Sequence, residues 1–95
     1  MASITSLLDV QIQPDHVGEA RDVIDSILVA TRAFAGCQGV DVLVDVADES
    51  HFVLVEHWES LEHDDAYRAW RATPEGTSAL NGILESRHLT RLTPA

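Results

Sequence analysis

The chain has 95 residues, a length typical of one small domain, and its 45% hydrophobic content indicates a folded chain. Sixteen acidic residues against six basic ones give a formal net charge of −10. That charge repels phosphate backbones and anionic lipids, so we expect neither nucleic-acid nor membrane-surface binding. The N-terminus does not resemble a signal peptide and no apolar run reaches membrane-spanning length, which makes a cytoplasmic protein the default expectation.

The first third of the chain predicts a strand and then an amphipathic helix. Side chains alternate in character over residues 3–12, which is the period of a strand. Gln13-Pro14-Asp15 stops this pattern, and Asp15 is expected to cap the helix that follows. Apolar positions then recur at helical spacing up to Ala35-Gly36, where we expect the helix to end. The expected buried face comprises Val17, Ala20, Ile24, Ile27, Leu28 and Thr31.

The middle of the chain predicts two strands joined by a polar turn. Residues 39–46 alternate, residues 47–50 read as the turn, and residues 51–59 alternate again. Because both faces of the last strand are partly apolar, we expect both to be covered, and a second subunit is the simplest cover for the face away from the helices. One face carries Phe52, Leu54, Glu56 and Trp58, and the other carries His51, Val53, Val55 and His57.

The last third predicts a helix, a short helical piece and a final strand. Ser60 is expected to cap the helix, on which His63, Tyr67 and Trp70 share one face. Thr73-Pro74 predicts a short helix through residues 79–84, and residues 86–93 alternate as a strand. The order β-α-β-β-α-β predicts an α+β, ferredoxin-like fold, with a four-stranded antiparallel sheet and both main helices on one face.

The stretch FVLVEHWES, followed by the helix DDAYRAW, resembles the antibiotic biosynthesis monooxygenase domain family of the dimeric α/β-barrel superfamily. In that family, a strand ends in an aromatic or aliphatic residue, Glu, any residue and Trp, and a polar cap follows. Phe52, Glu56, Trp58 and Ser60 match this pattern in place. Many members have a histidine nine residues beyond the tryptophan, where this chain has Tyr67. The resemblance covers nearly the whole chain, by element order and length, and it implies a dimeric α/β barrel. We expect residues 1–95 to form a single domain of this kind.

The resemblance also implies a set of possible reactions. Family members include cofactor-independent monooxygenases that oxidise aromatic polyketide quinols or anthrones with molecular oxygen. Related members degrade haem with an asparagine on the first strand and a histidine on the second helix. This chain has no asparagine in its first strand, which disfavours the haem-degrading activity. Other members are cyclases or quinol-responsive proteins.

Our leading hypothesis is therefore a homodimeric, cofactor-independent monooxygenase that acts on a planar phenolic, quinol or anthrone-type molecule. Oxygenation without a cofactor requires a deprotonated, electron-rich substrate, and a neutral imidazole can take that proton. We expect His63 and Tyr67 to be catalytic. His57 is the weaker candidate base because it points to the opposite face of the sheet from Trp58. The expected substrate-binding residues are Trp58, Trp70, Glu56 and Phe52.

Other interpretations of the same residues stay open. Large aromatic side chains most often fill cores, which is the commoner role for Trp58, Tyr67 and Trp70. If Glu56 is buried, it needs a partner such as Arg91 or a histidine. The chain could also be a non-catalytic dimeric module that binds a small ligand, or a polyketide cyclase or isomerase on the same fold.

The sequence gives no sign of a metal site or a disulfide. His51, His57 and His63 lie across a strand and a helix, and the chain contains no HxH or HxxxH pair. Cys37 is the single cysteine and has no CxxC partner. We expect no cofactor and no metal, a small aromatic molecule as ligand, and a second copy of the chain as partner across the open face of the sheet.

Overall fold

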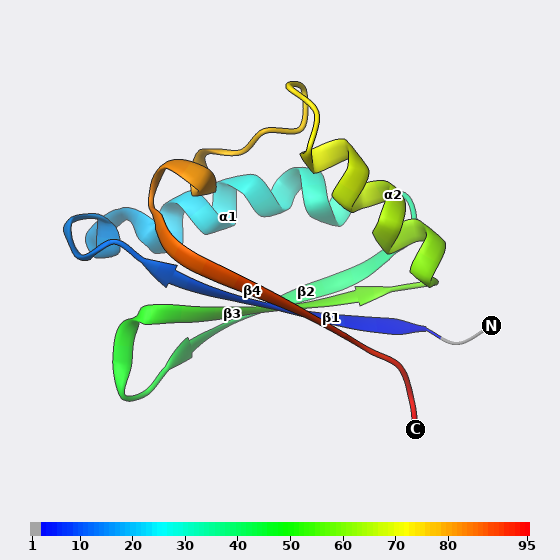
Figure 1. Ribbon diagram of the computed structural model, residues 1–95, viewed down its shortest axis with the longest axis horizontal. Helices are drawn as coiled ribbons and strands as arrows, with labels where there is room; N and C mark the ends of the chain where they lie inside the picture. The colour runs from blue at the N-terminus through cyan, green and yellow to red at the C-terminus, as the bar shows by residue number, and fades with distance from the viewer. Residues whose placement is uncertain (1–2) are drawn as a thin grey trace.

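A computed structural model describes residues 3–95, which form a four-stranded antiparallel sheet covered on one face by two helices (Figure 1). The strands are ordered β2-β3-β1-β4 across the sheet. This arrangement confirms the predicted α+β, ferredoxin-like fold. The elements in chain order are β1 (Ile4–Ile12), the 3₁₀ turn η1 (Pro14–His16), α1 (Val17–Ala33), β2 (Cys37–Asp45), β3 (Asp48–Trp58), α2 (Leu61–Arg71), the 3₁₀ turn η2 (Ala79–Gly82) and β4 (Leu84–Leu92).

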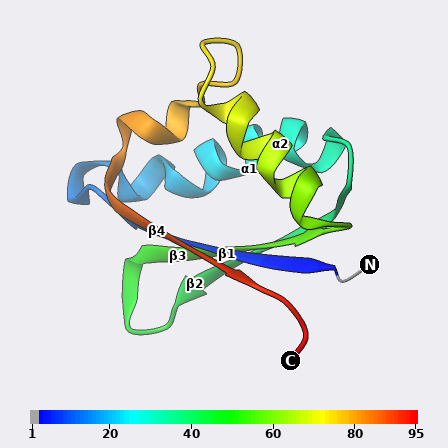
Figure 2. The ribbon, with the colours of Figure 1, turned by 45° about the vertical axis from the view of Figure 1, so that its right-hand side comes forward.

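The two central strands, β1 and β3, show the alternation that the sequence predicts. Glu56 on β3 lies opposite Ser6 on β1, and both side chains are buried on the helix-facing side of the sheet. Trp58 and Leu54 share that side and are also buried, whereas His57 on the other face is half-buried. Figure 2 shows both helices on the same side of this sheet. Since a strand has a period of two residues, the register fixes which side chains can approach the helices.

Helix α1 covers one half of the sheet with the face that its apolar spacing predicts. Ala20, Ile24, Leu28 and Thr31 are its buried residues. The predicted cap is wrong, however, because Asp15 lies inside η1, and His16 precedes α1 without a side-chain capping hydrogen bond. Proline fixes the backbone angle φ of Pro14 for a tight turn, so a turn of 3₁₀ helix precedes the α-helix.

The helix also ends two residues before the predicted Ala35-Gly36 pair, at Ala33. Phe34 is already extended, and Gly36 adopts a positive φ of 88° in the turn that leads into β2. The ring of His63 fills the space where a side chain at position 36 would stand. Glycine at this position therefore allows both the left-handed backbone and the close approach of α2.

Two connections differ from the sequence prediction. The β2–β3 hairpin turns at residues 46–47, earlier than the polar stretch suggested, so β3 begins at Asp48. The expected helix after Thr73-Pro74 is a turn followed by η2, and β4 begins at Leu84. The Thr73 hydroxyl donates to the carbonyl of Trp70 at 2.6 Å and accepts from the Gly76 amide at 3.2 Å. These side-chain hydrogen bonds to the backbone compete with the backbone hydrogen bonds that a helix would form here.

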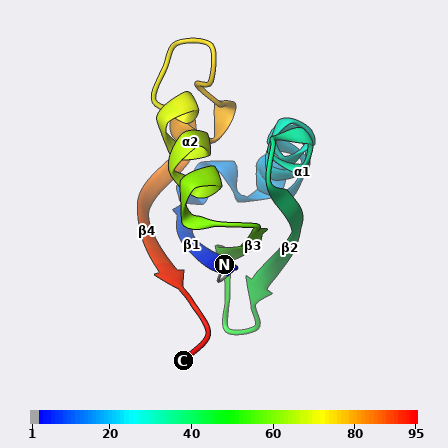
Figure 3. The same ribbon diagram turned by 90° about the vertical axis from the view of Figure 1, so that its right-hand side faces the viewer.

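The face of the sheet opposite the helices is left uncovered by them (Figure 3). Val53, Val55 and Leu7 on the central strands are half-buried there, while Leu43 and Leu92 near the edges are 53% and 45% exposed. None of the helices in residues 3–95 covers this face. We refer to it below as the open face.

Candidate functional site

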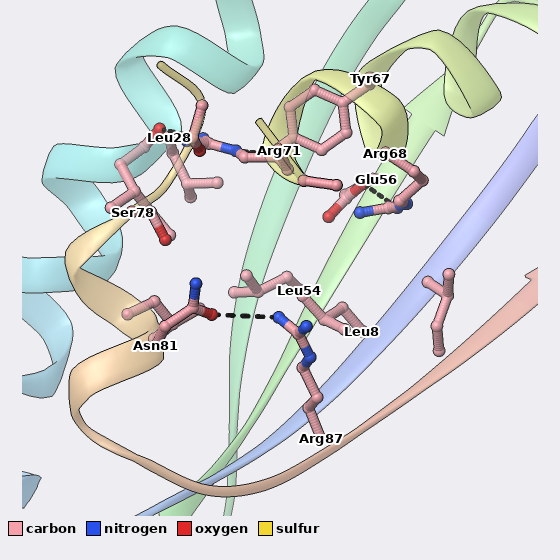
Figure 4. A pocket seen from close by; sticks show the side chains of 15 residues that line it. Leu8, Leu28, Leu54, Glu56, Tyr67, Arg68, Arg71, Ser78, Asn81 and Arg87 are labelled. Atoms are coloured by element: carbon pink, nitrogen blue, oxygen red, sulfur yellow. Dashed lines mark hydrogen bonds and ion pairs between the residues drawn. The ribbon is translucent and has the colours of Figure 1, made fainter. Parts of the chain in front are cut away.

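A cavity of about 380 Å³ lies between the sheet and α2, in the region where η2 and the segment before it close one end. Its apolar side comes from Leu8, Leu54 and Leu89 on three neighbouring strands and from Leu28 on α1. Its polar side chains gather at two places, as Figure 4 shows. Glu56, Tyr67, Arg68 and Arg71 lie at one, and Ser78, Asn81 and Arg87 at the other. A volume of this size fits a small organic ligand.

Two of the residues expected from the sequence, Glu56 and Tyr67, line this cavity. Trp58 and Phe52 are buried in the core, and neither contributes to the cavity lining. Trp70 is half-buried and also lies outside the lining. The structure thus divides the expected cluster: its polar members Glu56 and Tyr67 reach the cavity, and its tryptophans pack behind them.

Glu56 is a buried carboxylate, with 1% of its surface exposed. Its Oε1 accepts from Arg68 Nη2 at 2.5 Å and from the Trp58 indole nitrogen at 3.1 Å. The sequence correctly indicates that a buried Glu56 needs a partner, but the predicted partners, Arg91 or a histidine, are not the ones that the structure shows. Both interactions stabilise the charged carboxylate at the cavity wall, because a buried charge must be paired and hydrogen-bonded.

Asp64 lies behind this pair and is fully buried. The Ser6 hydroxyl donates to Asp64 Oδ2 at 2.9 Å. Arg68 Nε stands 3.0 Å from Asp64 Oδ1 but does not meet hydrogen-bond geometry, so this contact is an ion pair only. Arg91 reaches Asp64 Oδ2 at 3.5 Å and Asp65 at 2.6 Å. Arg68 therefore pairs with two buried carboxylates at once, Glu56 and Asp64, and Arg91 adds a second positive charge beside Asp64.

The hydroxyl of Tyr67 belongs to a second network, which joins α1 to α2. Tyr67 Oη lies 2.7 Å from Thr31 Oγ1 and accepts from Arg71 Nε at 2.7 Å. Arg71 Nη2 also donates to the Ile27 carbonyl and to Thr31 Oγ1, each at 3.0 Å, and its Nη1 donates to the Gly76 carbonyl at 3.2 Å. Arg71 thus holds the tyrosine hydroxyl in a fixed position beside the cavity.

The ring of Tyr67 is held by an aromatic cluster with Phe34, Trp58 and Trp70. The centroid distances from the Tyr67 ring are 5.3 Å to Phe34, 5.0 Å to Trp58 and 6.2 Å to Trp70. Distances in this range are typical of packed aromatic pairs. The tryptophans consequently support the tyrosine from behind, in the core-packing role that the sequence left as an alternative.

The histidines lie away from the cavity lining. His63 Nδ1 is 2.7 Å from Ser60 Oγ, which also accepts from the His63 amide and so caps α2 as the sequence predicts. His57 is on the open face, 3.3 Å from Asp41. His51 on that face bridges Asp45 and Asp9 at 2.9 Å each. The hydrogen bond to Asp45, followed by that to Asp9, raises the pKa of His51.

Sequence reasoning missed the arginines of the cavity. All six basic residues of the chain are arginines, and three of them, Arg68, Arg71 and Arg87, line the cavity. One signal was available, because Asp64–Arg68 and Tyr67–Arg71 have the i,i+4 spacing of contacts along a helix. In residues 3–95, no helix is long and apolar enough to cross a membrane, and no cluster of three His, Cys, Asp or Glu side chains could hold a metal ion.

Comparisons with known proteins give a family and a fold. The sequence profile of the family "Antibiotic biosynthesis monooxygenase" matches residues 3–80. The comparison with curated proteins finds no match. The matched range contains Glu56, Tyr67, Arg68 and Arg71, and it ends before Arg87.

Several solved structures share the fold of this chain. A conserved protein from Methanosarcina mazei has a TM-score of 0.80 at 17% identity, with 97% of this chain and 92% of that chain covered. A protein from Deinococcus radiodurans, for which antibiotic biosynthesis monooxygenase activity has been proposed, has a TM-score of 0.79 at 24% identity over 97% and 92% of the two chains. A protein from Nitrosomonas europaea with the same proposed activity has a TM-score of 0.81 at 14% identity over 97% and 89%.

Proposed function

Because the chain belongs to the antibiotic biosynthesis monooxygenase family, we propose that it is a cofactor-independent monooxygenase that oxidises a planar phenolic, quinol or anthrone-type molecule with molecular oxygen. One observation carries this proposal. A cavity of about 380 Å³ combines an apolar leucine surface with a buried carboxylate, a fixed phenol and arginines. Such a site can bind flat rings and stabilise an anion formed on them.

The reaction begins with loss of a proton from the substrate. Glu56 is the carboxylate among the lining residues of the described chain, so we assign it the role of proton acceptor. The positive charges of Arg68 and Arg71 and the hydroxyl of Tyr67 then stabilise the resulting anion. His63, the base expected from the sequence, is the competing assignment; it is on α2, one turn before Tyr67, and it does not line the cavity.

The oxygen step balances without a cofactor. For an anthrone, the proton leaves the methylene carbon, and the carbanion passes one electron to O₂. The carbon radical and superoxide combine to a peroxide, which takes up a proton and loses water to leave a carbonyl. One oxygen atom therefore enters the product and the other leaves as water. The protein supplies binding, proton transfer and stabilisation of the anion.

The direct test is oxygen uptake with a panel of anthrones and quinols in chelator-treated buffer, together with product analysis. We expect turnover above the uncatalysed rate in air and none under argon. Product formation under argon would indicate the cyclase or isomerase alternative, and ligand binding without any turnover would indicate the binding module. Either result would contradict the proposal.

Two variants identify the base. Glu56→Gln removes the proposed proton acceptor but keeps the shape of the side chain, so kcat/KM should fall roughly 100-fold. His63→Asn should leave kcat/KM within about threefold of the wild-type value. The reverse pattern would assign the proton to His63. Thermal unfolding of both variants checks that the fold is retained.

We further propose that the protein is a homodimer that associates through the open face. Val53, Val55 and Leu7 form an apolar strip across the central strands, and Leu43 and Leu92 extend it at the edges. Burial of such a surface against a second copy is favourable, and a small domain gains stability from it. The cavity lies on the opposite side of the sheet, so the two copies would place their sites on the outside of the shared sheet layer.

A further inference from the structure

We propose that the ligand of the cavity carries a carboxylate, which Arg87 binds at the end opposite Tyr67. This inference rests on the proposed function insofar as the cavity is taken as the ligand site. It adds a substrate class: a planar molecule with a hydroxyl at one end and an ionised acid at the other.

The distribution of charge supports an anionic ligand. The chain carries a net charge of −10, yet three of its six arginines line one cavity with a single carboxylate, Glu56. Glu56 pairs with Arg68 at 2.5 Å. In residues 3–95, no carboxylate lies within 4.0 Å of the guanidinium of Arg71 or Arg87. Two positive charges therefore face the cavity without a carboxylate partner in an otherwise acidic protein.

The hydrogen bonds distinguish these two arginines. Arg71 donates to Tyr67, Gly76, Ile27 and Thr31, which uses four of the five N–H groups of a guanidinium. Arg87 makes one protein hydrogen bond in the described chain, from Nη1 to Asn81 Oδ1 at 3.2 Å. Arg87 consequently keeps enough donors for the two-pronged contact that a guanidinium makes with a carboxylate.

The position of Arg87 fits this role. It is on β4, an edge strand, and its side chain lies on the helix side of the sheet because Arg87 pairs with buried Val10. Figure 4 shows Arg87 and Asn81 across the cavity from Arg71 and Tyr67, with Leu8 and Leu54 between the two groups. A rigid ring system lying on these leucines would reach the tyrosine hydroxyl with one end and the guanidinium of Arg87 with the other.

The experiment compares two ligands that differ in the acid alone. Calorimetric titration under argon with 2-naphthol and with 6-hydroxy-2-naphthoate measures binding without oxidation, because the oxygen that the reaction consumes is absent. We expect the naphthoate to bind at least tenfold more tightly, the effect of one charged hydrogen-bonded contact. The isomer 1-hydroxy-2-naphthoate, which has both groups at one end, should lose most of this advantage.

Two variants locate the contact. Arg87→Gln should reduce the preference for 6-hydroxy-2-naphthoate over 2-naphthol to within about threefold, and Arg21→Gln should leave it unchanged. Arg21 is the matched control because it is exposed on α1 and pairs with Asp25 at 3.0 Å, outside the cavity. Equal binding of the two ligands by the wild type, a preference that persists in Arg87→Gln, or no binding of either ligand would overturn the proposal.

These outcomes are separable from those of the oxygenase assay. The titrations are made without oxygen, so a protein that turns over no anthrone can still show the acid preference. Conversely, an active oxygenase could bind both naphthalene ligands equally. That result would leave the proposed function standing and would contradict the inference that the ligand carries a carboxylate.

Discussion

Arg71 donates through Nε to the hydroxyl of Tyr67, four residues earlier on the same helix, at 2.7 Å. The tyrosine oxygen must accept this hydrogen bond, so its own proton is available to Thr31 Oγ1 or to a molecule in the cavity. If the proposed function holds, this relationship makes Tyr67 a positioned hydrogen-bond donor for an oxyanion on the substrate.

Replacement of Tyr67 by phenylalanine should therefore impair catalysis more than folding. Tyr67→Phe removes one hydroxyl and keeps the ring, so we expect kcat/KM for an anthrone to fall roughly 100-fold. The free energy of unfolding should fall by about 1–2 kcal/mol, because Arg71 loses one acceptor. Thr31→Val is the control, since it disturbs the same network from outside the cavity lining. An equal loss of activity in Thr31→Val would mean that Tyr67 acts through structure alone.

Arg68 should be essential for stability. Arg68→Met leaves the buried carboxylate of Glu56 without a cation and leaves Asp64 with Arg91 alone, so we expect a loss of about 3–5 kcal/mol in the free energy of unfolding. Urea denaturation measures this loss. The double variant Glu56→Gln/Arg68→Met should recover part of it, because the carboxylate that the single variant leaves without a cation is gone. A single variant as stable as the wild type would contradict the buried network.

Gly36 should not tolerate a side chain. Gly36→Ala places a Cβ 2.2 Å from Cγ of the His63 ring, at a φ of 88° that disfavours other residues. We expect destabilisation of at least about 1–3 kcal/mol, measured by chemical denaturation. Gly18→Ala is the matched control, because nothing lies within 4 Å of a Cβ there and the position is in a helix. That variant should be unchanged or more stable by about 0.5–1 kcal/mol.

His51 should make stability depend on pH. Asp45 and Asp9 raise the pKa of His51 in the folded protein above its ordinary value near 6.5. The folded state then binds the proton more tightly than the unfolded state does. The stabilisation is thus fully present below about pH 6.5 and is lost as the pH rises through the raised pKa.

The urea midpoint measured between pH 5.5 and 8.5 tests this assignment. The wild type should lose stability across the upper part of this range, and His51→Gln should show a flatter profile. Asp45→Asn should weaken the dependence as well, because Asp45 is the larger cause of the pKa shift. A slope in His51→Gln as steep as in the wild type would assign the effect to another group.

The open face should control the oligomeric state. Leu43→Glu places a charge on an exposed position of that face, where it would be desolvated in a dimer. Sedimentation velocity should show a dimer for the wild type and a monomer for this variant. Val29→Glu is the control, since Val29 is 70% exposed on α1. Dissociation by both variants, or by neither, would argue against association through the open face.

The sequence predicts strands and their faces well where burial enforces a period of two. The alternation of Phe52, Leu54, Glu56 and Trp58 identifies the helix-facing side of β3 because a shift of one residue would expose all four. The segment after α2 is harder to predict. There, the side chain of Thr73 forms two local hydrogen bonds, and such bonds leave no periodic pattern in the sequence.

The lining of the cavity could be predicted only in part, for a similar reason. Glu56 could be singled out because it matches the family pattern, and Tyr67 because it shares a helix face with His63 and Trp70. Arg71 instead binds the carbonyl of Ile27, 44 residues away, and Arg87 enters the cavity because of the register between β1 and β4. Contacts of this kind depend on the assembled fold, so residue spacing alone cannot reveal them.

The bonds of Arg71 have an evolutionary consequence. The same guanidinium that positions the Tyr67 hydroxyl also fastens α1, α2 and the segment at Gly76 together. A mutation that reshapes this end of the cavity would loosen three parts of the fold. The opposite end is free of that constraint, because Arg87 is on an edge strand and bonds one neighbouring side chain, Asn81. The lining of the cavity can therefore diverge through β4 and η2, while the surroundings of the Tyr67 hydroxyl stay under selection for folding.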